Sequence, residues 1–594
     1  MSVSTPARQT RFRRRRSGAT LALGAALLVG WTVAAAPDPA SLTLSIVGTT
    51  DLHGFIFPRE GRGGLAVLGG YLANLRAARA AEGGGVVLLD AGDTYLGGIE
   101  SGMSEGAVVV DAYNALGYSA AALGNHDLEF GAIDQWPFGV ASGDPRGAIK
   151  ALARQARYPM LAANLIDRAT QAPVAWPNVR PSAITTVAGV RVGLVGVMTH
   201  DALSLTLGAN VGGLETSGLV EAVVREARQV RADGAQVVVV VSHAGGTCTN
   251  FADAADVTSC DDSAEIFEVA RRLPAGLVDV IVAGHTHDAV AHMVAGIPIV
   301  QAYSWGRAFS RVDLTLGRRD GAVRGARPFA PQEVCAWREP ANDACAATPS
   351  ASAVVAHYEG RKVQPLAAVS AAMAPALARV SGWRATPLGV TATTPIDRGP
   401  GDAESPLGNL FAEALAAVVP GVDGAFSYGA GAGGLRADLG AGPLSLGAVY
   451  DLFPFDNRVV PVTLRGADVR ALLLDHLRRP RFRSRALGVS GLRVAFDCRA
   501  GRDAVELRRV GGAPLGDTET LRLVVTDFLA ARVAALRLPG VVIGVPPRDL
   551  QVRDAALTWL RGRRHLARGD VTEHGAPRWA RSAASIAGCQ TPPQ

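Results

Sequence analysis

Five apolar segments in the first half of the chain each end in residues of the kind that bind metal ions. The segments end in TTDLHG, AGDTY, LGNHD, VSHAGG and AGHTHD. The residues concerned are Asp51, His53, Asp93, Asn125, His126, His243, His285 and His287. In an open α/β sheet, ligands bind beyond the carboxyl ends of the strands, so side chains from distant strands can converge there. The pattern therefore predicts one metal centre assembled from five strands of an α/β fold.

The first half of the chain also alternates apolar runs with amphipathic segments, which predicts an α/β sandwich. We expect strands at residues 42–47, 86–90, 192–197, 237–241 and 278–282, and helices at 65–81, 109–116, 219–231 and 264–273.

The second half of the chain predicts a further α/β unit. We place the first domain at residues 41–327, a linker at 328–385, a second domain at 386–563 and a tail at 564–594. Tyr358, Leu366 and Leu377 have helical spacing, which predicts a connecting helix within residues 351–380. A shorter helix is expected at 410–417.

The amino terminus carries the positive charge of the chain. Of the 594 residues, 59 are Lys or Arg and 53 are Asp or Glu, which gives a net charge of +6. Residues 1–36 contain six Arg and no acidic residue, so the remainder is formally neutral. That balance argues against a nucleic-acid polymer as partner. We expect a monomer that acts on a small molecule.

Residues 1–36 have a basic start, an uncharged apolar run and small residues before a Pro-rich break, which predicts a signal peptide and a periplasmic or secreted protein. The alternative is an uncleaved membrane anchor. The six cysteines agree with export, since they form an even set without CxxC spacing. We expect Cys248 to pair with Cys260, Cys335 with Cys345, and Cys498 with Cys589; the alternative is six free thiols.

Imidazole, carboxylate and amide ligands together suit Zn²⁺, Mn²⁺ or Fe, whereas an all-oxygen set would favour Ca²⁺ or Mg²⁺. Each motif alone is a weak indication, but five of the eleven histidines lie inside these motifs. Asp93 is the natural bridging ligand between two divalent ions. Such a pair of ions lowers the pKa of a bound water molecule and so supplies a nucleophile.

The order DxH, GD, GNHD, strand-end His and GHxH resembles the calcineurin-like metallophosphatase superfamily. With the later segments LGNLFAEAL, GGLRADL and YDLFPFDN, the chain is similar to the secreted 5′-nucleotidase and UDP-sugar hydrolase family. The resemblance implies a four-layer α/β/β/α metallophosphatase domain, a linker helix and an α/β substrate-binding domain. It implies one metal ion held by Asp51, His53, Asp93 and His287, and a second held by Asp93, Asn125, His243 and His285.

The same resemblance makes His126 the catalytic histidine, with Glu129 as its acidic partner where Asp is commoner in the family. For His126 the alternative is a buried histidine that caps a turn. In the second domain, Phe455 and Phe528 occupy the positions of two rings that enclose a nucleobase, and Arg436 matches a phosphate-contacting arginine.

This pocket departs from the family pattern in three places. The Asn of an NGGG turn is missing from Gly431–Gly434, Arg532 and Ala534 stand within the segment that replaces GGDGF, and Arg398 substitutes for an arginine upstream of LGN. The resemblance implies a phosphoric ester hydrolase, most simply a 5′-nucleotidase. Alternatives are a 2′,3′-cyclic nucleotide phosphodiesterase, a UDP-sugar hydrolase or another phosphoesterase, and a binding protein that has lost catalysis.

Overall fold

The computed structural model describes residues 40–133, 143–347, 350, 352–400, 404–429, 434–455, 457–478, 486–497, 504–544, 550–572 and 577–581. The predicted signal peptide and the predicted pair Cys498–Cys589 lie outside the described residues. Within these ranges, no helix has both the length and the apolar character needed to cross a bilayer.

Two large sheets form the centre of the first domain. The seven-stranded sheet has the order β18(Val323–Glu333), β17(Ala308–Gly317), β1(Ser41–Thr49), β4(Gly85–Asp90), β5(Ala120–Ala122), β6(Met160–Leu161), β9(Val179–Arg180). The six-stranded sheet has the order β10(Ser182–Val187), β11(Val190–Met198), β13(Val237–His243), β14(Val280–Ala283), β16(Ile297–Ala302), β15(Ala289–Val294). β1, β4 and β5 are parallel, as are β11, β13 and β14, so the carboxyl ends within each set share one edge.

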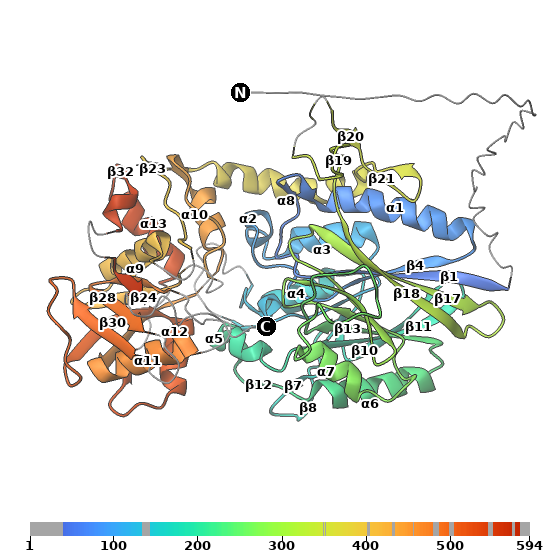
Figure 1. Cartoon of the computed structure of the whole chain (residues 1–594), viewed down its shortest axis with the longest axis horizontal. Helices are drawn as coiled ribbons and strands as arrows, with labels where there is room; N and C mark the ends of the chain where they lie inside the picture. The colour runs from blue at the N-terminus through green and yellow to red at the C-terminus, as the bar shows by residue number, and fades with distance from the viewer. Residues whose placement is uncertain are drawn as a thin grey trace, which may run out of the picture. The chain divides into compact units, whose positions relative to one another are not determined.

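Alternating side chains place these sheets face to face with helices outside them. In β4, Val87 and Leu89 enter the core between the sheets, whereas Leu88 packs with the helices α1(Leu65–Ala81) and α3(Ala107–Leu116). In β13, Val239 faces the inter-sheet core and Val240 faces α6(Leu219–Ala232) and α7(Glu265–Arg272). Figure 1 shows the two helix pairs on opposite sides of the strands. The predicted four-layer α/β/β/α architecture is confirmed.

Two glycines allow the sheets to approach closely. A Cβ at Gly196 of β11 would lie 2.2 Å from the Cβ of Leu161 in β6. A Cβ at Gly48 of β1 would lie 2.3 Å from a methyl carbon of Val282 in β14. Both distances are far below van der Waals contact, so any larger residue at these positions forces the layers apart.

Shorter elements surround these layers. They are α2(Ile99–Gly102), α4(Gly147–Gln155), α5(Gly208–Val211), β2(Pro58–Arg59), β3(Arg62–Gly63), β7(Leu165–Asp167), β8(Ala172–Pro173), β12(Leu214–Thr216), β19(Trp337–Arg338) and β20(Val354–Val355).

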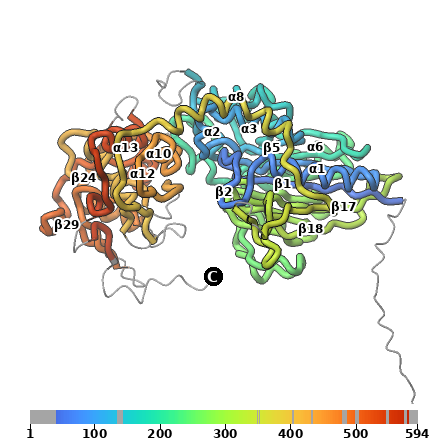
Figure 2. The backbone as a smooth tube through the Cα atoms, turned by 90° about the horizontal axis from the view of Figure 1, so that it is seen from above, coloured from blue at the N-terminus to red at the C-terminus, as the bar shows by residue number. Residues whose placement is uncertain are grey.

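The connecting helix begins later than the spacing predicts. It is α8(Ala367–Arg384), and the preceding residues form β20 and the hairpin of β21(His357–Tyr358) and β22(Arg361–Lys362). The prediction of helix over residues 351–366 is therefore wrong. Gly360 turns the hairpin with φ +72°, a conformation that breaks a right-handed helix. α8 packs against α1 and α3 of the first domain and against α10(Leu446–Leu452) beyond the linker, and its course can be followed in Figure 2.

The second domain contains three small sheets. Their orders are β27(Gly488–Ser490), β24(Gly424–Ser427), β30(Thr520–Thr526), β26(Val459–Arg465), β31(Val542–Ile543); then β25(Gly442–Ser445), β23(Pro387–Ala392), β32(His565–Leu566); and β29(Ala504–Arg509), β28(Leu492–Asp497), β33(Trp579–Arg581). Its helices are α9(Pro406–Val418), α10, α11(Gly466–Arg478), α12(Asp527–Ala535) and α13(Val552–Arg561).

Two local findings refine the predicted limits in this half of the chain. α9 begins before residue 410, because Ser405 caps it by accepting from the N–H of Gly408 and Pro406 occupies its first turn. β32 and β33 lie within the predicted tail yet pair with β23 and β28, and Trp579 is fully buried. The chain beyond residue 563 therefore contributes to the second domain.

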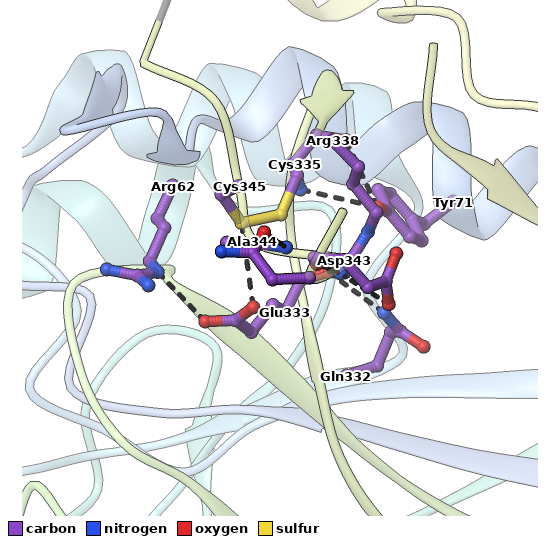
Figure 3. The surroundings of a disulfide bond; sticks show 10 residues. Arg62, Tyr71, Gln332, Glu333, Cys335, Arg338, Asp343, Ala344 and Cys345 are labelled. Atoms are coloured by element: carbon purple, nitrogen blue, oxygen red, sulfur yellow. Dashed lines mark hydrogen bonds and ion pairs between the residues drawn. A yellow bond between two sulfur atoms is a disulfide. The ribbon is translucent and has the colours of Figure 1, made fainter. Parts of the chain in front are cut away.

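The predicted disulfides Cys248–Cys260 and Cys335–Cys345 are both formed. Figure 3 shows the second pair, where the Tyr71 hydroxyl of α1 lies 3.1 Å from the carbonyl oxygen of Cys335. Glu333, beside this pair, forms an ion pair with Arg62 at 2.8 Å. The loop after β18 is thus fastened to α1 and to the β2–β3 hairpin.

We expect Gly196→Ala to lower the free energy of unfolding of the first domain by about 1–3 kcal/mol, because the added methyl group overpacks the space between the sheets. Urea denaturation followed by circular dichroism measures the change. Gly325→Ala is the matched control, since Gly325 lies in β18, is exposed and has no atom within 4 Å of an added Cβ. It should leave stability unchanged or raise it by up to about 1 kcal/mol. Equal effects of the two substitutions would contradict the close approach at Gly196.

Candidate metal centre

The sequence-predicted ligands all lie at or just beyond the carboxyl ends of strands. Asp51 and His53 follow β1, Asp93 follows β4, Asn125 follows β5, and His243 is the last residue of β13. His285 and His287 follow β14. Because each set of parallel strands ends at one edge, the two facing sheets bring these loops together between their ends.

The structure gathers these side chains into two groups that share Asp93. Asp51, His53, Asp93 and His287 offer ligand atoms that all lie within 4.8 Å of one another, and so do Asp93, His243 and His285. The Oδ1 atom of Asn125 lies 3.2 Å from Nε2 of His243, which places the amide beside the second group. The first group has the members of one ligand set implied by the family resemblance, and the second group has three of the four members of the other set, with Asn125 beside it.

The donor atoms in both groups face one another. Nε2 of His53 lies 3.0 Å from Nε2 of His287, and Nδ1 of His285 lies 3.2 Å from Nε2 of His243. Oδ1 of Asp51 is buried without a hydrogen-bond partner among the described residues; Nε2 of His287 is 3.4 Å away. Buried polar atoms require partners, and lone pairs that converge on one point suit a cation. The residues present therefore fit divalent metal ions.

The backbone at this edge is strained. Asp51, His53, Asp93, His285 and His287 all have positive φ, between 50° and 79°. L-residues seldom adopt this conformation, and such residues cluster at functional sites. The neighbouring backbone is also crowded, since a Cβ at Gly124 would lie 2.3 Å from Oδ1 of Asp93. The loops turn sharply enough to direct five ligand side chains into one small volume.

The pKa values of the site residues are shifted by burial and by neighbouring charges in ways that suit a bound cation. Burial raises the pKa of Asp51, but His287 and His243 outweigh it and lower the pKa to about 2. Burial, reinforced by the charge of His287, lowers the pKa of His53 well below its usual value. Burial also opposes charge on His243, yet Asp93 and Asp51 raise its pKa to about 10. A divalent ion would take over the charge compensation that the proton on His243 provides.

His126 forms the predicted pair with Glu129. Its Nδ1 atom lies 2.8 Å from Oε2 of Glu129, and its ring centroid lies 5.2 Å from that of His53. Burial lowers the pKa of His126, but the carboxylates of Glu129 and Asp93 outweigh burial and raise it. The longer Glu side chain therefore reaches the imidazole, and the pair favours a protonated ring next to the metal ligands.

Two buried carboxylates hold the loop that carries Asp93, and the sequence analysis did not identify either of them. Asp127 accepts hydrogen bonds from the N–H groups of Asp93 at 3.1 Å, Thr94 at 2.8 Å and Gly124 at 2.8 Å. Asp90 accepts from the Thr94 hydroxyl at 2.7 Å and from the N–H of Gly92. Burial and the charge of Asp93 raise the pKa of Asp127 to about 7. The acidic residues flanking AGD and GNH were the only signal in the sequence.

Trp305 is a second residue that the motifs did not indicate. Its backbone N–H donates to the carbonyl oxygen of Asp51 at 2.7 Å, and its ring lies 6.4 Å from the ring of His287 in an edge arrangement. Its φ of 63° belongs to the same strained region as the ligands. The contact supports the loop after β1 and the imidazole of His287 from one side.

Two of the predicted substrate residues lie near His126. The ring of Phe455 is 5.7 Å from that of His126, and the Arg436 guanidinium lies 5.0 Å from the centre of the Phe455 ring. The positive charge of Arg436 reaches His53 and His126, because it opposes protonation of both. Arg398 donates through Nε to Asp438 at 2.9 Å and through Nη1 to the carbonyl oxygen of Arg436 at 3.3 Å.

Phe528 contacts an arginine and a tyrosine of the second domain. The guanidinium of Arg532, one turn along α12, lies 4.7 Å from the centre of the Phe528 ring. Arg532 is 8% exposed, and its Nη1 lies 3.2 Å from Nδ1 of His476. The ring of Tyr428 is 6.0 Å from that of Phe528. Residues 430–433, which include most of the altered glycine turn, lie outside the described part of the chain.

Comparison with known proteins relates both halves of the chain to characterised families. Residues 44–289 match the calcineurin-like phosphoesterase family, and residues 387–533 match the 5′-nucleotidase C-terminal domain. Cell wall protein Lmo0130 of Listeria monocytogenes is 25% identical over 552 residues, which cover 86% of this chain and 66% of the relative. A 5′-nucleotidase of Vibrio cholerae is 27% identical over 295 residues, which cover 46% of this chain and 48% of the relative.

The fold is shared with a solved structure, the 5′-nucleotidase precursor from Thermus thermophilus. The similarity has a TM-score of 0.67 at 23% identity and covers 91% of this chain and 100% of that one. The chain spans less than two thirds of the length of the two curated relatives above. The chain therefore combines a calcineurin-like phosphoesterase domain, which carries the strand-end ligands, with a 5′-nucleotidase C-terminal domain.

Proposed function

We propose that this protein is a divalent-metal-dependent hydrolase of phosphoric esters that acts on nucleotides, most simply a 5′-nucleotidase that releases nucleoside and phosphate. The observation that carries the proposal is the convergence of two ligand groups on Asp93, with the His126–Glu129 pair beside them. Asp51, His53, Asp93 and His287 would hold one ion, and Asp93, Asn125, His243 and His285 the other. The mixed N and O donors suit Zn²⁺, Mn²⁺ or Fe.

Bound divalent ions would lower the pKa of water and neutralise negative charge on a phosphoryl group. His126 supplies the proton chemistry. Its Nδ1 is bonded to Glu129, which orients the ring and leaves Nε2 to donate a proton to the departing oxygen. The carboxylates of Glu129 and Asp93 raise the pKa of the imidazole, which favours the protonated form that this step uses. Glu129 therefore acts through His126, and no nucleophilic side chain is required.

In this proposal, the second domain selects the substrate. Arg436 suits phosphate oxygens, because a guanidinium forms paired hydrogen bonds with them. Phe455 adds an aromatic surface close to His126. Arg532 favours a second candidate function, hydrolysis of phosphoesters in which no base is held between two rings, because its guanidinium already packs on Phe528. Sugar phosphates and cyclic or sugar-linked nucleotides belong to this class.

We further propose that the protein is exported and acts as a monomer. The apolar segment before residue 36, the two disulfides and the similarity to a cell wall protein support export. The domain limits at residues 327 and 385 remain predictions; β18 extends to Glu333, so the first sheet continues past the earlier limit.

The first test is phosphate release from AMP, UDP-glucose, 2′,3′-cyclic AMP and p-nitrophenyl phosphate after metal removal and after addition of Zn²⁺ or Mn²⁺. We expect metal-dependent release. His126→Ala should lower kcat by about 100-fold or more with metal content unchanged, since general acid catalysis contributes about 10²–10⁴-fold. His200→Ala is the control, because its side chain is 78% exposed. If the protein binds metal but releases phosphate from none of these substrates, the binding-protein alternative is favoured. An undiminished rate in His126→Ala would remove His126 from the reaction.

Asp127→Asn should weaken metal retention, because the amide cannot accept all the backbone hydrogen bonds that fix the Asp93 loop. Loss of such supporting contacts costs about 10–100-fold in metal affinity. Competition with a chromogenic chelator measures the affinity directly. Asp201→Asn is the matched control, since the Asp201 side chain is 67% exposed. Unchanged affinity in Asp127→Asn, with a lowered melting temperature, would reduce Asp127 to a purely structural role.

The contact between Arg532 and Phe528 leads to a prediction about how strongly kcat/KM depends on the nucleobase. If its guanidinium occupies the face of Phe528, the wild type should hydrolyse AMP and ribose 5-phosphate with kcat/KM values within about tenfold of each other, since base stacking normally contributes about 1–3 kcal/mol. Arg532→Ala should raise the preference for AMP by about fivefold or more. Arg537→Ala, an exposed arginine just beyond α12, should not. A strong preference for AMP that Arg532→Ala abolishes would mean that the base packs on the guanidinium instead.

A further inference from the structure

A third group of metal-ligating residues lies outside the two groups around Asp93. It consists of Cys248, Cys260 and His292, whose ligand atoms all lie within 4.8 Å of one another. Cys248 and Cys260 face each other in an antiparallel bridge and form a disulfide, and His292 lies on β15. The group shares no residue with the two groups around Asp93.

His292 is an unusual histidine for a protein interior. It is 0% exposed, and neither ring nitrogen has a hydrogen-bond partner among the described residues. Its only described ring contact is with Phe251, at 5.9 Å. Leaving such a group unpaired inside a protein is unfavourable, so a buried imidazole without hydrogen-bond partners calls for an explanation.

The second disulfide provides a comparison within the same chain. Glu333 lies within the same reach of Cys335 and Cys345, but its carboxylate is already compensated by Arg62 at 2.8 Å. His292 has no hydrogen-bond partner among the described residues, although the Asp256 carboxylate interacts with it electrostatically. Two thiolates and one neutral imidazole are a common ligand set for Zn²⁺, and their combined charge neutralises the ion. A fourth position could be taken by water, since Cys260 is partly exposed.

We propose that reduction of the Cys248–Cys260 disulfide creates a zinc-type metal site with His292 as the third protein ligand. A phosphine reductant takes the oxygen of one water molecule, becomes a phosphine oxide and converts the disulfide into two thiols. Binding of the divalent ion then releases the two thiol protons. The filled site satisfies one nitrogen of His292 and keeps both sulfurs from reoxidation.

The site lies close to the main centre in the sequence. The N–H of Cys248 donates to the carbonyl oxygen of Ala289 at 3.0 Å, and the Thr247 hydroxyl donates to Asp288 at 2.8 Å. Asp288 and Ala289 directly follow His287. The two centres are nevertheless chemically distinct, because the ligands proposed for the main centre include no sulfur. A thiolate-specific signal therefore reports on the third site alone.

The test uses the full chain and Co²⁺ as the probe. Oxidised and phosphine-reduced protein are titrated with Co²⁺, and the thiolate-to-cobalt charge-transfer band is recorded. We expect the band, with one additional cobalt per chain, only in the reduced protein, and we expect Zn²⁺ to remove it. The double variant Cys248→Ser and Cys260→Ser is the blank for all other thiols, and the double variant Cys335→Ser and Cys345→Ser should retain the band.

His292→Ala removes a direct ligand of the proposed site. Loss of a residue that only supports a ligand costs roughly 10–100-fold in metal affinity, and we expect this variant to lose more cobalt affinity than that. In the wild type, Zn²⁺ should also protect Cys248 and Cys260 of reduced protein from alkylation, as measured by mass spectrometry; this readout needs no variant. A reduced wild type with no band above the serine blank, or a His292→Ala protein that binds Co²⁺ as the wild type does, would overturn the proposal. Neither result depends on phosphatase activity.

Discussion

The position of Asp93 depends on hydrogen bonds from outside its own loop. Asp93 has a left-handed backbone, which an L-residue keeps only when its surroundings impose it. Asp127 provides that constraint by accepting from the N–H groups of Asp93 and Thr94 on one side and of Gly124 on the other. Because both ligand groups share Asp93, the position of their common ligand depends on this buried carboxylate.

The main strands and helices of the first domain follow from the side-chain pattern, whereas their four-layer order was implied by the family resemblance. A strand buried on both faces, such as β13, reads as a continuous apolar run, and the helix over residues 65–81 has the bounds that its spacing predicts. The same reasoning failed for the residues before α8, where it predicted a helix instead of β20 and the β21–β22 hairpin. Tyr358 and Leu366 are apolar because they cover α1, where the rings of Tyr358 and Tyr71 lie 5.3 Å apart and the N–H of Leu366 donates to Ala66. Contacts between one element and another produce no regular spacing of apolar residues, so they cannot be predicted from the sequence pattern.

The candidate site likewise contains some residues that the sequence predicted and others that it did not. Its ligand types could be read from the sequence, because strand ends bring side chains of defined chemistry to a known edge. The roles of Asp127 and Trp305 could not, since both act on backbone groups whose left-handed conformation is set by long-range packing. Arg532 is an intermediate case. Its departure from the family pattern is visible in the sequence, but its contact with Phe528 depends on the start of α12 at Asp527.

Guanidinium groups lie on two aromatic rings of the second domain that the sequence analysis assigned to substrate binding. Arg436 packs on Phe455 and Arg532 on Phe528, so each ring already has a cation as partner. A nucleobase competes with those cations for the ring faces, whereas a phosphate group gains from them. The charge of Arg436 also reaches His53 and His126. Positive charge of the second domain therefore acts on residues of the metal centre, which agrees with the proposal of a substrate that carries a phosphate group.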